Sequence, residues 1–172
     1  MTFSYNPALV LNANNEVPEG YEIRRTAKAV VIDGKGNSLV FRSSLIGGGV
    51  EDGESFEDAL YREALEEVGA KVEIIKDLGE VVAYRDVLKK KYIVRGFLCK
   101  YIKKVQEPTI QDPDEVKRGA SWERIEDTIN RIENDIEELK KQDPASYEGD
   151  YYQAKLYNRM SMLAFLKEAI IE

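Results

Sequence analysis

The sequence contains no histidine, and this absence excludes several kinds of chemistry. Catalytic triads that depend on histidine, zinc sites with imidazole ligands and acid–base catalysis by imidazole all need that side chain. The single cysteine, Cys99, excludes a disulfide within the chain. Because Cys99 lies in the apolar run 92–102, we expect a buried thiol on a strand.

Long apolar stretches are also missing. No segment approaches the roughly 18 apolar residues that a transmembrane helix needs, and the N-terminus lacks a basic segment followed by an apolar one. The sequence therefore predicts a cytoplasmic protein with no membrane partner. With 172 residues, 43% hydrophobic and 33% charged, the chain is typical of a soluble globular protein and favours one domain.

The net charge of −7 is concentrated in one stretch, residues 47–70, GGGVEDGESFEDALYREALEEVGA. This stretch holds eight acidic residues and one basic residue, so the rest of the chain is neutral. A neutral remainder argues against stable binding of nucleic acid, and a local acidic excess argues for a metal site.

The same stretch carries the signals of a helix of about 14 residues, 55–68. Ser55, followed three residues later by Asp58, is typical of an N-cap, and Gly69 lies where a left-handed residue would end the helix. We expect a glycine-rich loop before it, with glycines at 47, 48, 49 and 53.

On this helix, four charged side chains share one face. Glu63, Glu66 and Glu67 are neighbours at spacings of three and four residues, close enough to repel one another, and Arg62 lies beside them. With Glu54 on the incoming loop, such a cluster favours a bound cation, and oxygen ligands suit Mg²⁺ or Mn²⁺. The alternative is a solvated acidic face, which the glycine spacing and the isolated arginine disfavour.

Seven residues of the stretch follow a fixed spacing, with a chance probability of about one in 10⁸ for each start point. In order they are Gly48, Glu54, Arg62, Glu63, Glu66, Glu67 and Gly69, and Ala64 and Ala70 fill the apolar positions of the pattern. The stretch resembles the complete signature of the Nudix hydrolases. That resemblance implies attack of water on a diphosphate linkage with Mg²⁺, or Mn²⁺, as the cofactor.

Carried over to this chain, the resemblance gives each residue of the pattern a role. Glu63, Glu66 and Glu67 would be the metal ligands. A diphosphate brings at least two negative charges to these carboxylates, so a divalent metal must screen them. With no histidine, either a glutamate or the metal itself must activate the water.

The remaining residues of the pattern would support that centre. Arg62 would hold the carboxylates in place, and Glu54 would support the loop and the metal network. Gly48 and Gly69 would provide backbone geometry that a Cβ would obstruct. Many members of the family take a further carboxylate from a distant loop, and Glu115 is our first candidate, ahead of Asp114 and Asp112.

Substrate-binding residues are harder to identify from sequence. Arg25, Arg42 and Arg85 lie on strands or loops that could face a cleft, where each could pair with a phosphate; a structural or surface role is the alternative. Four aromatic residues could stack on a base or pack in the core: Tyr84, Tyr92, Tyr101 and Trp122.

The rest of the chain indicates an α+β fold, an α/β/α sandwich with a mixed sheet, which the resemblance also implies. We expect a lead-in over 1–22 with a short strand at 8–11, the sheet and the acidic helix over 23–122, and a helical part over 123–172. The expected strands are 23–32, 39–42, 72–75, 79–85, 92–102 and 120–122, with a lysine-rich hairpin at 89–91.

The C-terminal part is expected to form two antiparallel helices. The first carries a narrow apolar stripe, at Ile125, Ile129, Ile132, Ile136 and Leu139, and the second begins near Asp150. Either both helices pack on the sheet and on each other, or the narrow stripe docks a second copy and makes a homodimer.

The expected function is therefore hydrolysis of a nucleoside diphosphate linked to another group. A nucleoside or deoxynucleoside triphosphate pyrophosphohydrolase, giving a monophosphate and pyrophosphate, is the leading hypothesis because no added recognition module is visible. Alternatives are hydrolysis of ADP-ribose, nucleotide sugars or dinucleoside polyphosphates, and a catalytically silent nucleotide-binding regulator. Ile46 stands where many Nudix members have proline, and the segment 42–47 is short, which leaves the substrate class open.

Overall fold

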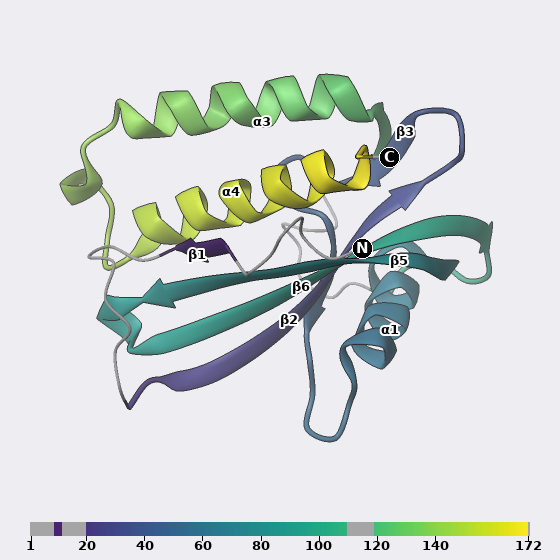
Figure 1. Cartoon of the computed structure of the whole chain (residues 1–172), viewed down its shortest axis with the longest axis horizontal. Helices are drawn as coiled ribbons and strands as arrows, with labels where there is room; N and C mark the ends of the chain where they lie inside the picture. The colour runs from purple at the N-terminus through teal and green to yellow at the C-terminus, as the bar shows by residue number, and fades with distance from the viewer. Residues whose placement is uncertain (1–8, 12–19, 110–118, 172) are drawn as a thin grey trace.

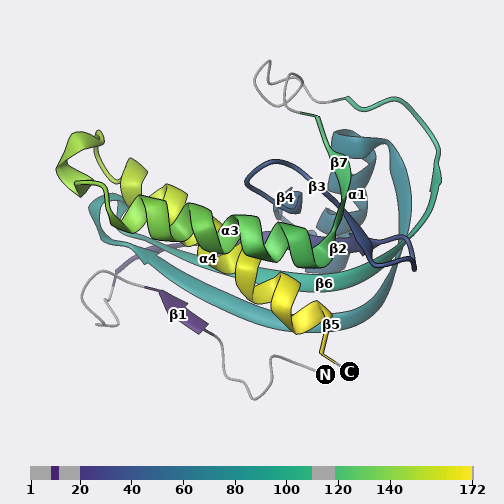
Figure 2. The same cartoon turned by 90° about the horizontal axis from the view of Figure 1, so that it is seen from above.

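The computed structural model describes residues 9–11, 20–109 and 119–171. It is a three-layer α+β sandwich, as predicted, with one helix on one face of a mixed sheet and two on the other (Figures 1 and 2). The helices are α1 (Phe56–Val68), α3 (Ile125–Lys140) and α4 (Tyr151–Ala169). The strands are β1 (Leu9–Leu11), β2 (Glu22–Ile32), β3 (Asn37–Val40), β4 (Ile46–Gly49), β5 (Ala70–Arg85), β6 (Lys90–Lys104) and β7 (Ser121–Arg124).

Strand β2 lies at the centre of the sheet, whose order is β1-β5-β6-β2-β3-β7. It runs parallel to β6 along its whole length and pairs antiparallel with both β3 and β4 on its other edge. The pairing with β4 places Ala27 opposite Gly48 and Lys28 opposite Gly47. The glycine-rich segment is therefore fixed to the middle of the sheet.

The two faces of β2 belong to two different cores, because successive side chains of a strand point to opposite sides. Ala27, Ala29 and Val31 are fully buried on the α1 side, whereas Val30 packs on the side of α3 and α4. By the same alternation, Lys28 lies on the face covered by α4, together with Thr26.

Helix α1 begins and ends as the sequence predicts. The side chain of Ser55 accepts a hydrogen bond of 3.0 Å from the backbone N–H of Asp58, and Gly69 adopts a left-handed conformation with φ of 63°. Leu60 and Ala64 are buried on its inner side. The local signals of residues 55–69 are therefore sufficient to set the ends of this helix.

The strands differ from the prediction at three places. The glycines Gly47–Gly49 form strand β4 rather than a loop, because β2 supplies them with backbone partners. The two strands expected at 72–75 and 79–85 are one strand, β5, in which three register shifts absorb the irregular sequence. Strand β3 begins and ends two residues earlier than expected, at Asn37–Val40.

The hairpin between β5 and β6 also lies a little earlier than expected. Its turn is the short 3₁₀ helix Asp86–Leu88, and Lys89 follows in a left-handed conformation. Lys90 and Lys91 already belong to β6.

The C-terminal helices pack on each other and on the sheet, which is one of the two expected arrangements. Every residue of the narrow stripe of α3 is at most 8% exposed. Its four isoleucines belong to the core shared with α4, β2 and β5. Within this chain the stripe is covered, so the suggestion that it docks a second copy is wrong. The expected homodimer itself stays a prediction.

Cys99 on β6 is fully buried, as expected, and burial raises the pKa of its thiol to about 12.

Among the described residues, no helix is both long enough and apolar enough to span a bilayer.

Candidate active site

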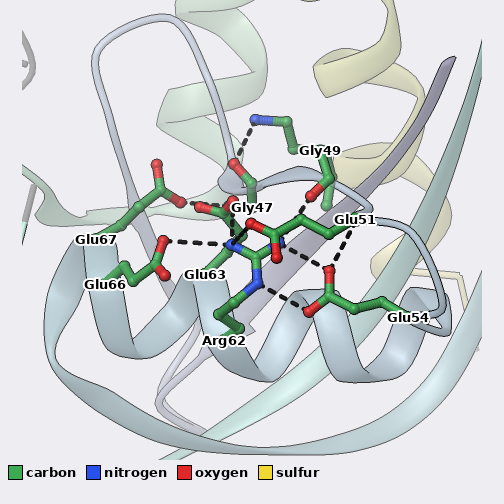
Figure 3. Close-up of polar contacts among 9 residues, drawn as sticks. Gly47, Gly49, Glu51, Glu54, Arg62, Glu63, Glu66 and Glu67 are labelled. Carbon is green, nitrogen blue, oxygen red and sulfur yellow. Dashed lines mark hydrogen bonds and ion pairs between the residues drawn. The ribbon is translucent and has the colours of Figure 1, made fainter.

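The candidate site lies where the exposed face of α1 meets strand β4. The backbone N–H of Gly47 donates a hydrogen bond of 2.6 Å to Oε1 of Glu67, which joins the two elements. Four of the residues predicted for the site, Arg62, Glu63, Glu66 and Glu67, extend from α1 toward the glycine strand (Figure 3). The structure thus brings the helical part of the sequence pattern together with its glycines.

Arg62 lies at the centre of this group and bonds to several of the acidic residues (Figure 3). Its Nε and Nη2 donate to the two carboxylate oxygens of Glu54, at 2.8 and 2.9 Å. Its Nη1 donates to Glu63 at 3.0 Å and to Glu66 at 3.3 Å, and its Nη2 also reaches the carbonyl oxygen of Gly49 at 2.8 Å. We call Arg62 with Glu54, Glu63, Glu66 and Glu67 the carboxylate cluster.

Within the carboxylate cluster, the pKa values of Glu54 and Glu63 are shifted in opposite directions. Hydrogen bonds from Arg62, then one from a backbone N–H, lower the pKa of Glu54 to about 2. Burial raises the pKa of Glu63 above its ordinary value, although Arg62 opposes that shift. The pKa of Arg62 is itself raised, first by its hydrogen bonds to Glu54. Glu54 is therefore a fixed anion bound to Arg62, whereas the surroundings of Glu63 make it easier to protonate than an exposed glutamate.

The glycines of the pattern have different reasons to be glycine. A Cβ on Gly48 would lie 2.5 Å from Oε1 of Glu63, but a Cβ on Gly49 would meet nothing within 4 Å. Gly47, at φ of 135°, would place a Cβ only 2.0 Å from the carbonyl oxygen of Ala27. The sequence pattern therefore keeps Gly48 small so that a carboxylate can lie against the strand.

Gly69 serves a different purpose at the end of α1. Besides its left-handed φ of 63°, a Cβ there would lie 1.9 Å from the carbonyl oxygen of Gln106. Its own carbonyl accepts a hydrogen bond of 2.8 Å from the N–H of Val105. Gly69 therefore permits a close contact between the end of the helix and the segment that follows β6.

The donor chemistry of the carboxylate cluster fits a hard divalent cation, because its ligands are carboxylate oxygens. The positions of the side chains are arranged about Arg62 rather than about a shared point. Among the described residues, no group of three or more aspartates, glutamates or cysteines is placed to hold a metal ion. Loading a metal therefore requires Glu63 and Glu66 to turn away from the guanidinium.

The three arginines predicted to bind substrate lie in three different places. Arg42 pairs with Asp135 of α3 at 2.9 Å, and Arg85 is held in two bonds, of 2.6 and 2.8 Å, by Asp150. Arg25 is exposed on β2, opposite Ile93 of β6. Arg85 lines a cavity described below. The candidates for a further carboxylate, Glu115, Asp114 and Asp112, lie outside the described residues.

One residue of the site was not identified from sequence. Lys28 of β2 donates from Nζ to the carbonyl oxygens of Gly47, at 3.0 Å, and Leu45, at 3.3 Å. The charge of Lys28 also opposes, by a small amount, the rise that burial causes in the pKa of Glu63. The only signal in the sequence was a lysine within a strand that is otherwise apolar at 27–32, which could have marked a buried polar contact.

Two cavities include residues named above for the site. The first, which we call the α4 cavity, has a volume of about 430 Å³ and lies between α4 and strands β2, β5 and β6, with Lys28 in its wall. The second, the β7 cavity, has a volume of about 570 Å³ and includes Glu67 and Trp122. Both volumes are within the range of about 300–1,000 Å³ that small-molecule sites occupy.

The predicted stacking residues are divided between these cavities and the core. Tyr92 lines the α4 cavity. Tyr101 and Trp122 line the β7 cavity and pack edge to face, with ring centroids 5.4 Å apart. Tyr84 is 4% exposed, so it packs in the interior.

Comparison with known proteins shows the family to which this chain belongs. The family model of the NUDIX domain matches residues 22–143, and this chain belongs to the Nudix family. Among solved structures, a NUDIX hydrolase from Nitrosomonas europaea is 17% identical with a TM-score of 0.49, covering 81% of this chain and 90% of that one. The E. coli ORF135 protein is 18% identical with a TM-score of 0.51, covering 67% of this chain and 83% of its own, which supports the shared fold. A search of curated proteins found no match.

Proposed function

We propose that this Nudix protein hydrolyses nucleoside or deoxynucleoside triphosphates to a monophosphate and pyrophosphate, using Mg²⁺ or Mn²⁺. The observation that carries the proposal is the carboxylate cluster, in which one arginine holds Glu54, Glu63 and Glu66 beside the glycine strand. A purely structural ion pair would not need so many carboxylates around one cation, because each extra one adds repulsion.

In this proposal Glu63, Glu66 and Glu67 hold the metal. When bound, a divalent cation screens the carboxylates from the incoming phosphates and polarises the phosphoryl oxygen that is attacked. Arg62 keeps Glu63 and Glu66 beside the glycine strand before the metal enters, and both side chains turn from the guanidinium to the metal when it binds. Glu54, whose low pKa keeps it ionised, fixes the guanidinium in turn.

Activation of the attacking water falls to a carboxylate of this chain or to the metal, since the sequence has no imidazole. Glu63 is a candidate base in place of its role as a metal ligand, because burial raises the pKa of its carboxyl and so makes its carboxylate a stronger proton acceptor. The loop carboxylate Glu115 is the second candidate for this role or for a further ligand.

The test is an assay that separates products by anion-exchange chromatography. It would use dATP, dGTP, ADP-ribose, NADH, a nucleotide sugar and a dinucleoside polyphosphate, each with Mg²⁺ and with Mn²⁺. We expect a monophosphate and pyrophosphate from the triphosphates, with little turnover of the others. Two phosphate-bearing halves from ADP-ribose or a dinucleoside polyphosphate would replace this substrate class with another. Binding without turnover of any compound would favour the nucleotide-binding regulator.

A further inference from the structure

The wall of the α4 cavity concentrates positive charge in a protein whose net charge is −7. Four cationic side chains line it, and none of the described lining residues is an aspartate or a glutamate. These four are Lys28 and Arg85 from the sheet, and Lys155 and Arg159 from α4. Because the described lining contains no acidic side chain, cations of both the sheet and α4 would attract an anion in this cavity.

Asp150 already neutralises one of these four positive charges, that of Arg85. It is 8% exposed and holds Arg85 in two hydrogen bonds, so Arg85 has little capacity for another anion. The ammonium group of Lys155 lies over the rings of Tyr147 and Tyr151, at 5.5 and 5.3 Å from their centroids. These rings are neutral, and in the part of the chain that the structure describes no carboxylate forms an ion pair with Lys155.

Arg159 is the strongest candidate in this cavity for binding an anion. Its guanidinium donates hydrogen bonds to the backbone carbonyl oxygen of Lys155, at 3.1 Å, and to Oγ of Ser43, at 3.2 Å, and both acceptors are neutral. Burial is the largest influence on the pKa of Arg159 and lowers it. The charge of Asp135 raises this pKa by a smaller amount, and the charge of Arg42 lowers it by a still smaller amount. Within residues 20–109 and 119–171, no carboxylate forms an ion pair with Arg159. A partly buried guanidinium of this kind binds phosphate well, because two of its N–H groups can meet two oxygens.

The segment 43–47 connects this arginine to the carboxylate cluster. Arg159 bonds to Ser43 at one end of it, and Lys28 bonds to the carbonyls of Leu45 and Gly47 toward the other. Four residues of extended chain span at most about 14 Å, so Ser43, which accepts the bond from Arg159, lies within about that distance of Gly47. Lys28 lies between them, in the wall of the same cavity.

We propose that the α4 cavity binds the terminal phosphates of the substrate, with Arg159 and Lys155 as the contacts and Lys28 at the entrance from the carboxylate cluster. This inference rests on the proposed function and deepens it, because it makes the chain specific for triphosphates. A substrate such as ADP-ribose, which carries only the diphosphate that is cleaved, places no phosphate on Arg159.

The first test measures binding of tripolyphosphate, in buffer without metal, by titration calorimetry. Arg159→Gln removes the charge and keeps a hydrogen-bonding side chain, and Lys155→Gln is a second variant that avoids the Ser43 contact. Arg124→Gln, at an arginine that is 68% exposed near the start of α3, is the matched control. We expect wild type and the control to bind alike, and each cavity variant to bind at least about tenfold more weakly, equivalent to about 1.4 kcal/mol.

The second test compares dATP with ADP-ribose as substrates of the same variants. We expect Arg159→Gln to raise KM for dATP about tenfold with kcat nearly unchanged, because binding in the ground state and in the transition state is lost equally. Turnover of ADP-ribose, even if slow, should change less than about twofold.

The outcomes separate this inference from the proposed function. Equal losses for dATP and ADP-ribose would overturn the inference, since that result is expected if a nucleoside fills the cavity. Absence of tripolyphosphate binding to wild type, or unchanged binding by both cavity variants, would overturn it as well. If no compound is hydrolysed with any metal, the proposed function fails, and tripolyphosphate binding still decides whether the cavity takes phosphates.

Discussion

Arg62 and Arg159 both extend from helices that pack on the central sheet, yet their surroundings are opposite. Arg62 donates to three carboxylates, and these bonds raise its pKa. Arg159 donates to two neutral oxygens, and burial lowers its pKa. The difference shows how one chain can use the same side chain to hold acidic groups in place or to attract an anion from outside.

Between the two arginines lies the glycine strand β4, with Lys28 bonded to its carbonyls. On one side of the strand negative charge gathers, and on the other side positive charge lines a cavity. A phosphate chain that crosses this boundary would place its cleaved linkage near the carboxylates and its terminal phosphates near the cations. The predictions below test each side of that boundary.

The largest effect is expected at the carboxylates that face Arg62. We predict that Glu66→Gln lowers kcat/KM at least about a hundredfold, because the change removes a proposed metal ligand without altering side-chain size. Glu57→Gln is the control, since Glu57 is exposed in the first turn of the same helix. Steady-state kinetics with the best triphosphate would check this. Equal activity of the two variants would remove Glu66 from the site.

A smaller loss is expected when the glycine strand is changed. Gly48→Ala would press a methyl group against the carboxylate of Glu63, which must then move, so we predict a loss of activity of about tenfold or more with the fold intact. Gly49→Ala, with open space at its Cβ, should stay within about twofold of wild type. Kinetics together with circular dichroism would compare them. A matching loss in both variants would mean that the strand tolerates no side chain, whatever lies opposite.

The smallest effect is expected in the pH dependence of stability. Bonds from Arg62 lower the pKa of Glu54 to about 2, from an ordinary value near 4.5. A carboxyl with a lowered pKa stabilises the folded state fully above its ordinary pKa, and this contribution is lost as the pH falls toward about 2. Melting temperatures of wild type and Arg62→Gln should therefore differ most above pH 5 and converge below it. A difference that grows as the pH falls would contradict this assignment.

The parts of the molecule that local chemistry determines could be predicted from the sequence. Helix α1 depends on Ser55 and Gly69, whose effects act within a few residues, and its charged face follows from the helical repeat. The stripe of α3 was also visible, but a stripe does not identify the surface that covers it. Only the fold shows that α4 and the sheet bury it.

Other features depend on residues far apart in the chain. Glycine has little preference for strands, so β4 exists because the edge of β2 supplies its hydrogen bonds. The site role of Lys28 could not be predicted because its acceptors, Leu45 and Gly47, come from a later segment. Arg159 depends likewise on Ser43, which is more than a hundred residues away.

The most direct test of the central claim is binding of Mn²⁺ to the carboxylate cluster, measured by electron paramagnetic resonance without substrate. The account predicts that wild-type protein and Glu57→Gln bind Mn²⁺ alike, and that Glu66→Gln and Glu67→Gln bind it at least about tenfold more weakly. Equal Mn²⁺ binding by all four proteins would contradict the claim that these glutamates hold the metal.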